Sequence, residues 1–163
     1  MKSHSSRQSL AVKMTTHILA YPFDPYHSIV EHQQKSGLDK QFGATSTFIG
    51  SMRDFNDNAD VTGMVLEHYP EMTQRYLDKL EQQARQKWDL LDVLIIHRVG
   101  KINPANPIVL IACWSAHRRA ALDACSWLIE ELKHNAPFWK KETRQDGERW
   151  VEENTDGFKP APH

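Results

Sequence analysis

Three basic residues stand where a helix normally avoids positive charge. His117, Arg118 and Arg119 follow Ser115, which is a good N-cap for a predicted helix over residues 116–135. A helix N-terminus carries partial positive charge and unpaired N–H donors, so exposed cations in the first turn cost roughly 0.3–1 kcal/mol each. A bound anion reverses this penalty, because the backbone donors and the cations converge on it. We interpret His117 and Arg118 as candidate anion ligands; the alternative is that these side chains simply point into solvent.

A second group of cations surrounds a Pro-Phe-Trp turn in the stretch KHNAPFWKKE. Lys133, Lys140 and Lys141 bracket the aromatic residues, and His134 adds another donor. A lysine held beside aromatic rings is partly desolvated, which lowers its pKa toward the range useful for proton transfer. Alternatively, Lys133 only balances the negative end of the predicted helix dipole.

Arg53 is a further candidate, because it ends a predicted strand before a polar loop. Arginine binds phosphate or carboxylate through a bidentate fork, although a strand-end arginine is more often solvated. His68 and His97 lie in strand patterns and are interpreted as core or edge histidines rather than ligands. The sequence contains no HExxH, GxSxG, P-loop or GxGxxG motif, so metalloprotease, serine hydrolase, nucleoside-triphosphatase and dinucleotide-binding activities lack support.

The composition is that of an ordinary globular protein. The 163 residues are 40% hydrophobic and 25% charged, and the formal net charge of −1 argues against nonspecific nucleic-acid binding. Cys113 and Cys125 belong to no metal-binding pattern, so we expect buried free thiols and a reducing compartment. No apolar run approaches the ~20 residues of a membrane span, and the first residues lack the apolar core of a signal peptide. We therefore expect a cytoplasmic protein.

The elements that must position these residues follow from apolar periodicity and turn signals. Residues 1–14 are predicted to be a disordered arm, residues 15–154 a single domain and residues 155–163 a C-terminal tail. Helices are predicted over residues 25–35, 71–88 and 116–135. Strands are predicted over residues 16–21, 42–53, 61–69, 90–100 and 107–114, and on both sides of the Asp146-Gly147 turn.

The order of these elements decides the fold class. Residues 42–53 and 61–69 are predicted to pair as a hairpin with a wide loop, and hairpins also stand where a doubly wound sheet would need helical crossovers. The sequence therefore predicts an α+β protein with a largely antiparallel sheet. In the helix over residues 71–88, the residues Met72, Tyr76, Leu80 and Ala84 are expected to form the apolar face.

Several strings between Gly43 and Glu153 together resemble the large subunit of molybdopterin synthase. They are TFIGSMRDFN, LEHYPEMT, IIHRVGKINP, WSAHRRAALDA, LKHNAPFWKKE and GERWVE. They follow the family's order over most of the chain, and SAHR combined with KxxAPFWK is far more specific than any one short pattern. One departure is Asn154, near a position where some relatives carry a basic residue.

The resemblance implies an α+β fold of the α/β-hammerhead type and a sulfurtransferase of molybdenum cofactor biosynthesis, with residues 15–154 as its catalytic domain. A homodimer of large subunits would carry two small ubiquitin-like sulfur-carrier subunits in a heterotetramer. Each carrier ends in a Gly-Gly thiocarboxylate, which delivers sulfur to cyclic pyranopterin monophosphate and builds the molybdopterin dithiolene. The resemblance implies no metal or nucleotide cofactor, no nucleic acid and no membrane partner. A non-catalytic module that binds a phosphorylated metabolite or an acidic tail is the competing hypothesis, and a small RNA-binding domain has less support.

The resemblance also implies roles for the cations. Lys133 and Lys140 match the family's catalytic lysines, whereas Arg53, His117 and Arg118 match positions that bind the phosphate or the pterin. Preorganised cations stabilise the negative charge that sulfur transfer develops, and each donor is worth roughly 3 kcal/mol in well-studied oxyanion sites. We assign Lys133 to the thiocarboxylate and its oxyanion, and Lys140 to general acid/base work.

Helix geometry separates two of these groups within one chain. His117 and Lys133 are sixteen residues apart in the predicted helix. At 1.5 Å per residue their backbones lie roughly 24 Å apart, which side chains cannot bridge around one small pterin. If both residues belong to one site, His117 and Arg118 must come from a neighbouring protomer across a two-fold interface.

Overall fold

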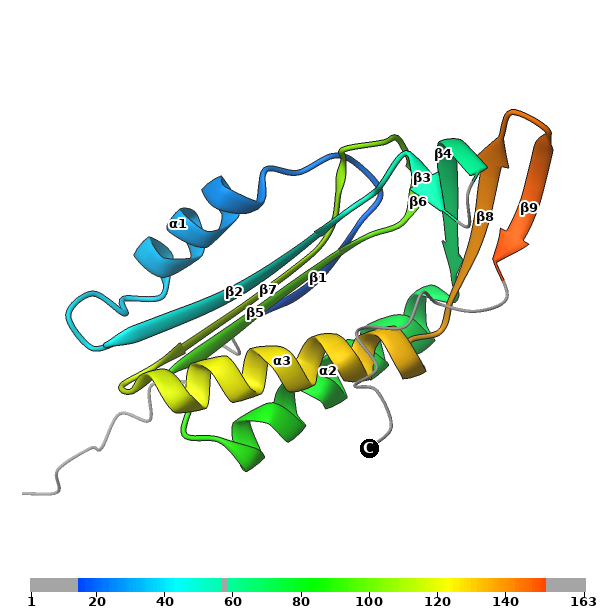
Figure 1. Ribbon diagram of the computed structural model, residues 1–163. Coiled ribbons are helices and arrows are strands. Elements are labelled where there is room, and N and C mark those ends of the chain that lie inside the picture. The colour runs from blue at the N-terminus through cyan, green and yellow to red at the C-terminus, as the bar shows by residue number, and fades with distance from the viewer. Residues whose placement is uncertain (1–14, 57–58, 152–163) are drawn as a thin grey trace, which may run out of the picture.

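A computed structural model describes residues 15–56 and 59–151 of the chain. Its long sheet has the strand order β1-β5-β7-β2, with β1 parallel to β5 and the other neighbours antiparallel (Figure 1). These strands are β1 (Thr16–Leu19), β5 (Asp92–Arg98), β7 (Pro107–Ser115) and β2 (Ala44–Ser51). Every residue of β5 is buried, because this central strand has helices over both faces of the sheet.

A second sheet stands at one end of the long sheet (Figure 1). Its strand order is β3-β4-β8-β9, and β6 pairs with the remaining part of β4. The strands are β3 (Phe55–Asn56), β4 (Ala59–His68), β6 (Gly100–Ile102), β8 (Phe138–Arg144) and β9 (Gly147–Val151). Gly147 has a φ of 127° at the β8–β9 turn, a conformation that favours glycine. The hairpin predicted at Asp146-Gly147 is therefore confirmed.

The helices are α1 (Pro25–Lys35), α2 (Pro70–Lys87) and α3 (Arg118–Asn135). α1 covers one face of the long sheet, and α2 and α3 cover the other (Figure 1). Asp24 caps α1, because its carboxylate accepts hydrogen bonds from the N–H groups of Tyr26 and His27 at 3.0 and 3.2 Å. α1 ends before Gly37, whose φ is 63°, as the sequence predicts.

The main core lies between the long sheet and the pair α2 and α3. On α2 it takes Leu77, Leu80 and Ala84, and Tyr76 packs against it, whereas Met72 is 55% exposed, so one of the four residues of the predicted apolar face is wrong. The error has a geometric cause: a strict four-residue spacing drifts by about 40° per step on a helix of 3.6 residues per turn. Mixed spacings of three and four residues stay on one face.

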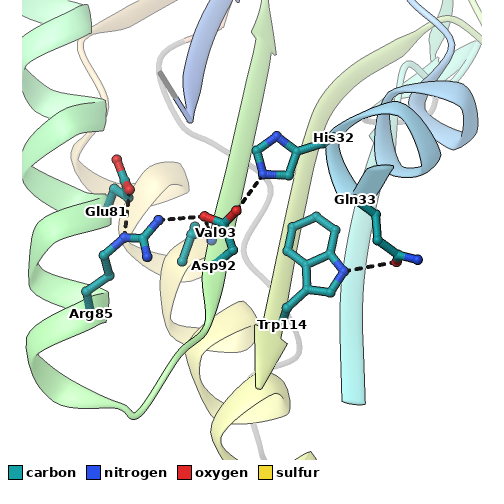
Figure 2. A network of polar contacts seen from close by, with 7 residues as sticks. All are labelled: His32, Gln33, Glu81, Arg85, Asp92, Val93 and Trp114. Carbon is teal, nitrogen blue, oxygen red and sulfur yellow. Dashed lines mark hydrogen bonds and ion pairs between the residues drawn. The ribbon is translucent and has the colours of Figure 1, made fainter. Parts of the chain in front are cut away.

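A buried polar network holds the layers together (Figure 2). Asp92 at the start of β5 accepts a hydrogen bond from Nη2 of Arg85 on α2 at 2.7 Å. Its other oxygen lies 2.9 Å from Nε2 of His32 on α1. Burial alone would raise the pKa of Asp92, but the hydrogen bonds from His32 and Arg85 outweigh it and hold that pKa well below its usual range. One carboxylate therefore anchors helices on both faces of the sheet.

Two predictions about the strands are wrong. Residues 42–53 and 61–69 do not form a hairpin with each other, because β2 pairs with β7 in the long sheet while β4 pairs with β8, β6 and β3 in the other. The chain changes sheets between the two strands, and that choice depends on long-range partners that local patterns do not encode. The sequence also missed β6, which lies inside the stretch interpreted as a turn.

Ser115 is not the N-cap of α3. It is the last residue of β7, and its hydroxyl donates to the carbonyl of His117 at 2.5 Å. α3 begins at Arg118 with His117 as its N-cap, and no side-chain hydrogen bond caps it. The long strand extends through the serine because β2 pairs with it as far as Ala44. The predicted C-terminal end of the helix before Pro137 is confirmed.

The described part of the chain combines a mixed sheet, an antiparallel sheet and three helices. This arrangement confirms the predicted α+β class. The predicted arm over residues 1–14 and the tail over residues 155–163 lie outside the described residues. Within the described ranges, none of the helices has the length and apolar character needed to cross a membrane.

Candidate functional site

Lys133 and Lys140 line the same cavity. Lys133 lies in the last turn of α3 and Lys140 in the middle of β8, and both side chains are partly buried. The cavity has a volume of about 110 Å³. Apart from the two lysines it is lined by Phe48, Gly50, Ser51, Leu66, His97, Ile108, Val109, Ile129, Leu132, Ala136 and Phe138. The wall is therefore mostly apolar, with two amines placed in it.

A short connection brings the two lysines together. α3 ends at Asn135, and Ala136 has extended backbone angles because a proline follows it. The chain then enters β8, which pairs with β4 so that Lys140 stands opposite Leu66. Side chains alternate along a strand, so Phe138 and Lys140 share the face that lines the cavity.

The next residue along β8 points away from the cavity. The ammonium group of Lys141 lies 2.7 Å from the carboxylate of Glu148 on β9, and 5.5 Å from the centre of the Trp150 ring. The hydrogen bond from Lys141 to Glu148 is the largest cause that raises the pKa of the Lys141 amine. Lys141 is consequently a matched control for Lys140, with the opposite electrostatic setting.

Electrostatics lower the pKa of Lys140. Burial is the largest cause, and the positive charge of Lys133 adds to it, while Glu142 acts in the opposite direction. Glu142 is itself buried and forms an ion pair with Arg144 at 2.9 Å. A lysine with a lowered pKa holds more neutral amine near pH 7, which general acid/base chemistry requires.

His97 is the residue that the sequence interpretation missed. It is only 5% exposed, which fits the expected core histidine, but it also lines the lysine cavity. Its Nδ1 lies 2.7 Å from the carbonyl oxygen of Arg98, and its ring stacks on Phe138 with centroids 4.0 Å apart. Burial is the main cause that lowers the pKa of His97 to about 4. Strand alternation could have indicated this, since Val93 and Ile95 face α2 and α3 and His97 is next on that face.

The structure does not bring the other candidates to the lysines within one chain. His117 and Arg118 are exposed at the start of α3, and Lys133 lies at the opposite end of that helix (Figure 1). At 1.5 Å per residue the separation remains roughly 24 Å. Arg53 is also exposed and lines another hollow, of about 360 Å³, with Met52, Asp54, Pro104 and Ala105.

The cavity can therefore hold a small anionic group. Two amines supply positive charge inside an apolar wall, where electrostatic interactions are stronger than in water. Over residues 15–56 and 59–151, no three His, Cys, Asp or Glu side chains gather as metal ligands. Cys113 and Cys125 are buried free thiols, as expected from the sequence.

Comparison with known proteins identifies the family. Residues 21–135 match the family model described as MoaE protein. The chain belongs to the MoaE family. It is 49% identical over 131 residues to the molybdopterin synthase catalytic subunit of Pseudomonas aeruginosa, a match that covers 80% of this chain and 85% of that relative. The resemblance found in the sequence motifs is confirmed, and the chain is placed among enzymes of molybdenum cofactor biosynthesis.

Solved structures of MoaE proteins share the fold. The molybdopterin biosynthesis MoaE protein from Burkholderia ambifaria superposes with a TM-score of 0.72 at 39% identity, covering 87% of this chain and 92% of that one. A complex of subunits 1 and 2 of molybdopterin-converting factor from Helicobacter pylori matches with a TM-score of 0.70 at 23% identity. That match covers 85% of this chain and 91% of that one, and it shows the fold alone.

Proposed function

We propose that this chain transfers sulfur from the thiocarboxylated C-terminus of a small carrier subunit to cyclic pyranopterin monophosphate, and so makes the molybdopterin dithiolene. The observation that carries the proposal is the convergence of Lys133 and Lys140 in one narrow cavity of a MoaE-family chain. An extended Gly-Gly tail has no side chains, so it fits a passage too narrow for most peptide ends.

The two lysines have different tasks in this proposal. Sulfur delivery develops negative charge on oxygen at an acyl carbon, and Lys133 stabilises the thiocarboxylate and that charge. Lys140 has the lowered pKa and therefore acts as the general acid/base. The apolar wall strengthens both effects because electrostatic interactions are stronger in less polar surroundings than in water.

His117 and Arg118 come to the site from a second copy of the chain. His117 and Arg118 lie too far from Lys133 to share a small substrate with it in one chain, so we assign them to the neighbouring protomer's pocket. With Arg53 they would hold the phosphate or the pterin. The proposed assembly is a homodimer that carries two small subunits, and the two-subunit complex from Helicobacter pylori supports a partner of this kind.

We also propose that residues 15–154 act as one catalytic domain and that the enzyme is cytoplasmic. The two sheets contribute residues to a single cavity, which supports one domain. The buried free thiols Cys113 and Cys125 fit a reducing compartment.

The deciding experiment is a sulfur-transfer assay with a thiocarboxylated carrier and cyclic pyranopterin monophosphate. The expected product is molybdopterin, with the carrier returned as its carboxylate. A carrier that lacks its last two glycines should deliver no sulfur. Tight binding of both partners without turnover would instead support the non-catalytic module.

A further inference from the structure

We propose that Nε2 of His97 accepts a hydrogen bond from the last peptide N–H of the carrier tail and thereby orients the terminal group between the two lysines. This inference rests on the proposed function and adds a specific contact to it. It begins from the position of His97 in the wall of the cavity that holds Lys133 and Lys140.

The contact of Nδ1 fixes which nitrogen of His97 can accept. Nδ1 lies 2.7 Å from the carbonyl oxygen of Arg98, and a carbonyl can only accept, so Nδ1 carries the hydrogen. In a neutral imidazole the other nitrogen then has a lone pair. Stacking on Phe138 at a centroid distance of 4.0 Å and an interplanar angle of 15° fixes the plane of the ring. The orientation of the acceptor is therefore set before a ligand arrives.

The surroundings of His97 keep its ring neutral. Burial is the largest cause of its lowered pKa of about 4, and the charges of Lys140 and His68 act in the same direction, while the Arg98 carbonyl opposes them. At neutral pH the imidazole is therefore an acceptor at Nε2, in a pocket whose other nitrogen groups are lysine donors.

The size of the cavity selects a peptide end over the pterin. Its volume of about 110 Å³ is well below the ~300–1,000 Å³ of pockets that enclose drug-sized molecules. A chain terminus inserted there brings a main-chain N–H immediately behind its terminal carboxyl group. A buried N–H without an acceptor is costly, so the pocket must supply one.

Among the cavity's side chains, few can meet that need. The polar ones are Ser51, His97, Lys133 and Lys140, and the two lysines are already assigned to the terminal thiocarboxylate and to proton transfer. Ser51 is exposed, whereas His97 is buried. His97 is accordingly the acceptor next to the terminal group, and it acts as a positioning residue for sulfur transfer.

The test deletes the proposed donor while leaving the protein unaltered. Two semisynthetic carriers would be prepared, one ending in Gly-Gly carboxylate and one with glycolate as its last residue, so that an ester oxygen replaces the final N–H. Calorimetry would measure their affinities for the full chain. We expect the ester to bind about tenfold more weakly, as for loss of one buried hydrogen bond. Equal affinity would overturn the inference without any variant.

Variants then assign the discrimination to one side chain. His97→Phe keeps a flat ring on Phe138 but has no acceptor, so it should bind the amide and the ester carriers alike, whereas His97→Gln should recover part of the difference. His68→Phe is the matched control, because His68 also contacts Phe138, at 6.3 Å, without lining the cavity. His68→Phe should bind the ester carrier more weakly than the amide carrier, as the unaltered chain does.

The outcomes separate this inference from the proposed function. If His97→Phe still binds the ester carrier more weakly than the amide carrier, the proposed contact is wrong. The same conclusion follows if the only defect of His97→Phe is a raised KM for the pterin. Normal sulfur transfer by the unaltered chain, without discrimination between the two carriers, would overturn the contact alone. If neither carrier binds the unaltered chain, the proposed function and the contact both fail.

Discussion

The two ends of α3 carry cations of similar type in opposite surroundings. At its start, His117, Arg118 and Arg119 are exposed, and no side chain caps the helix. At its end, Lys133 lies against a narrow apolar cavity that Lys140 of β8 also lines. Burial lowers the pKa of Lys140, and this effect requires side chains packed around the amine. The exposed cations at the start of α3 are instead accessible to a substrate or to a second copy of the chain.

This contrast indicates a division of labour. Chemistry that needs a lowered lysine pKa belongs to the enclosed end, and binding of a charged substrate group belongs to the open end. The predictions below change residues of the enclosed cavity, of the open start of α3, or of one of these regions in each chain of a mixed dimer.

Loss of either cavity lysine should have the largest effect. Lys133→Ala and Lys140→Ala should each lower turnover by about 100-fold or more, the range seen when a preorganised group that stabilises a transition state is removed. Both variants should remain folded, because each lysine is only partly buried. Sulfur-transfer kinetics and circular dichroism would check this.

Lys141→Ala is the control for that experiment, since its amine pairs with Glu148 outside the cavity. Its turnover should stay within about twofold of the unaltered chain, given how little exposed ion pairs contribute. Near-normal rates in both cavity variants would contradict the assignment of catalysis to the enclosed end.

The enclosed end should also make the protein sensitive to acid. His97 has a pKa lowered to about 4 in the folded chain against an ordinary 6.5. Between these values the unfolded chain binds a proton that the folded chain does not, so stability is complete above about pH 6.5 and falls as the pH drops toward 4. From pH 7 to pH 5 the loss attributable to His97 should be about 2 kcal/mol.

Urea unfolding at the two pH values would measure this term. In His97→Phe the difference between pH 7 and pH 5 should shrink by that amount. Asp92 does not confound the measurement, because its lowered pKa places its own loss of stability below pH 3.8. An unchanged pH dependence in His97→Phe would show that this ring does not resist protonation.

Mixing variants tests whether the two ends of α3 meet between protomers. A His117→Ala/Arg118→Ala chain and a Lys133→Ala chain would be combined under conditions that allow dimers to exchange. A heterodimer then has one intact pocket and one with all three changes. Random exchange makes about half of the dimers heterodimers, so activity should rise to about a quarter of the unaltered level. Confirmed exchange without recovery would place the site within one chain.

The sequence predicts the local parts of this site better than their assembly. Two local features depend mainly on neighbouring residues: the placement of the lysines around the Pro-Phe-Trp turn, and the end of α3 before Pro137. The structure has both the helix end and the strand β8 as expected. The error at Ser115 arose because an N-cap and a strand end look alike until the partner strand β2 is known. His97 was missed because its role depends on β8, more than forty residues away, placing Phe138 and Lys140 beside it.

The smallest predicted effect has opposite signs on stability and activity. Arg118 is the first residue of α3, where its positive charge opposes the helix dipole. Arg118→Ala should therefore raise the free energy of unfolding by about 0.3–1 kcal/mol while lowering sulfur transfer through weaker substrate binding. Arg119→Ala is the control: it also removes a cation, but it breaks the 3.7 Å contact with Asp123, so the two changes should nearly cancel. Urea unfolding and the KM for the pterin would be measured for both variants. A lower free energy of unfolding in Arg118→Ala would mean that this arginine stabilises the fold. A higher free energy of unfolding together with a raised KM would mean that Arg118 destabilises the start of α3 but binds the substrate.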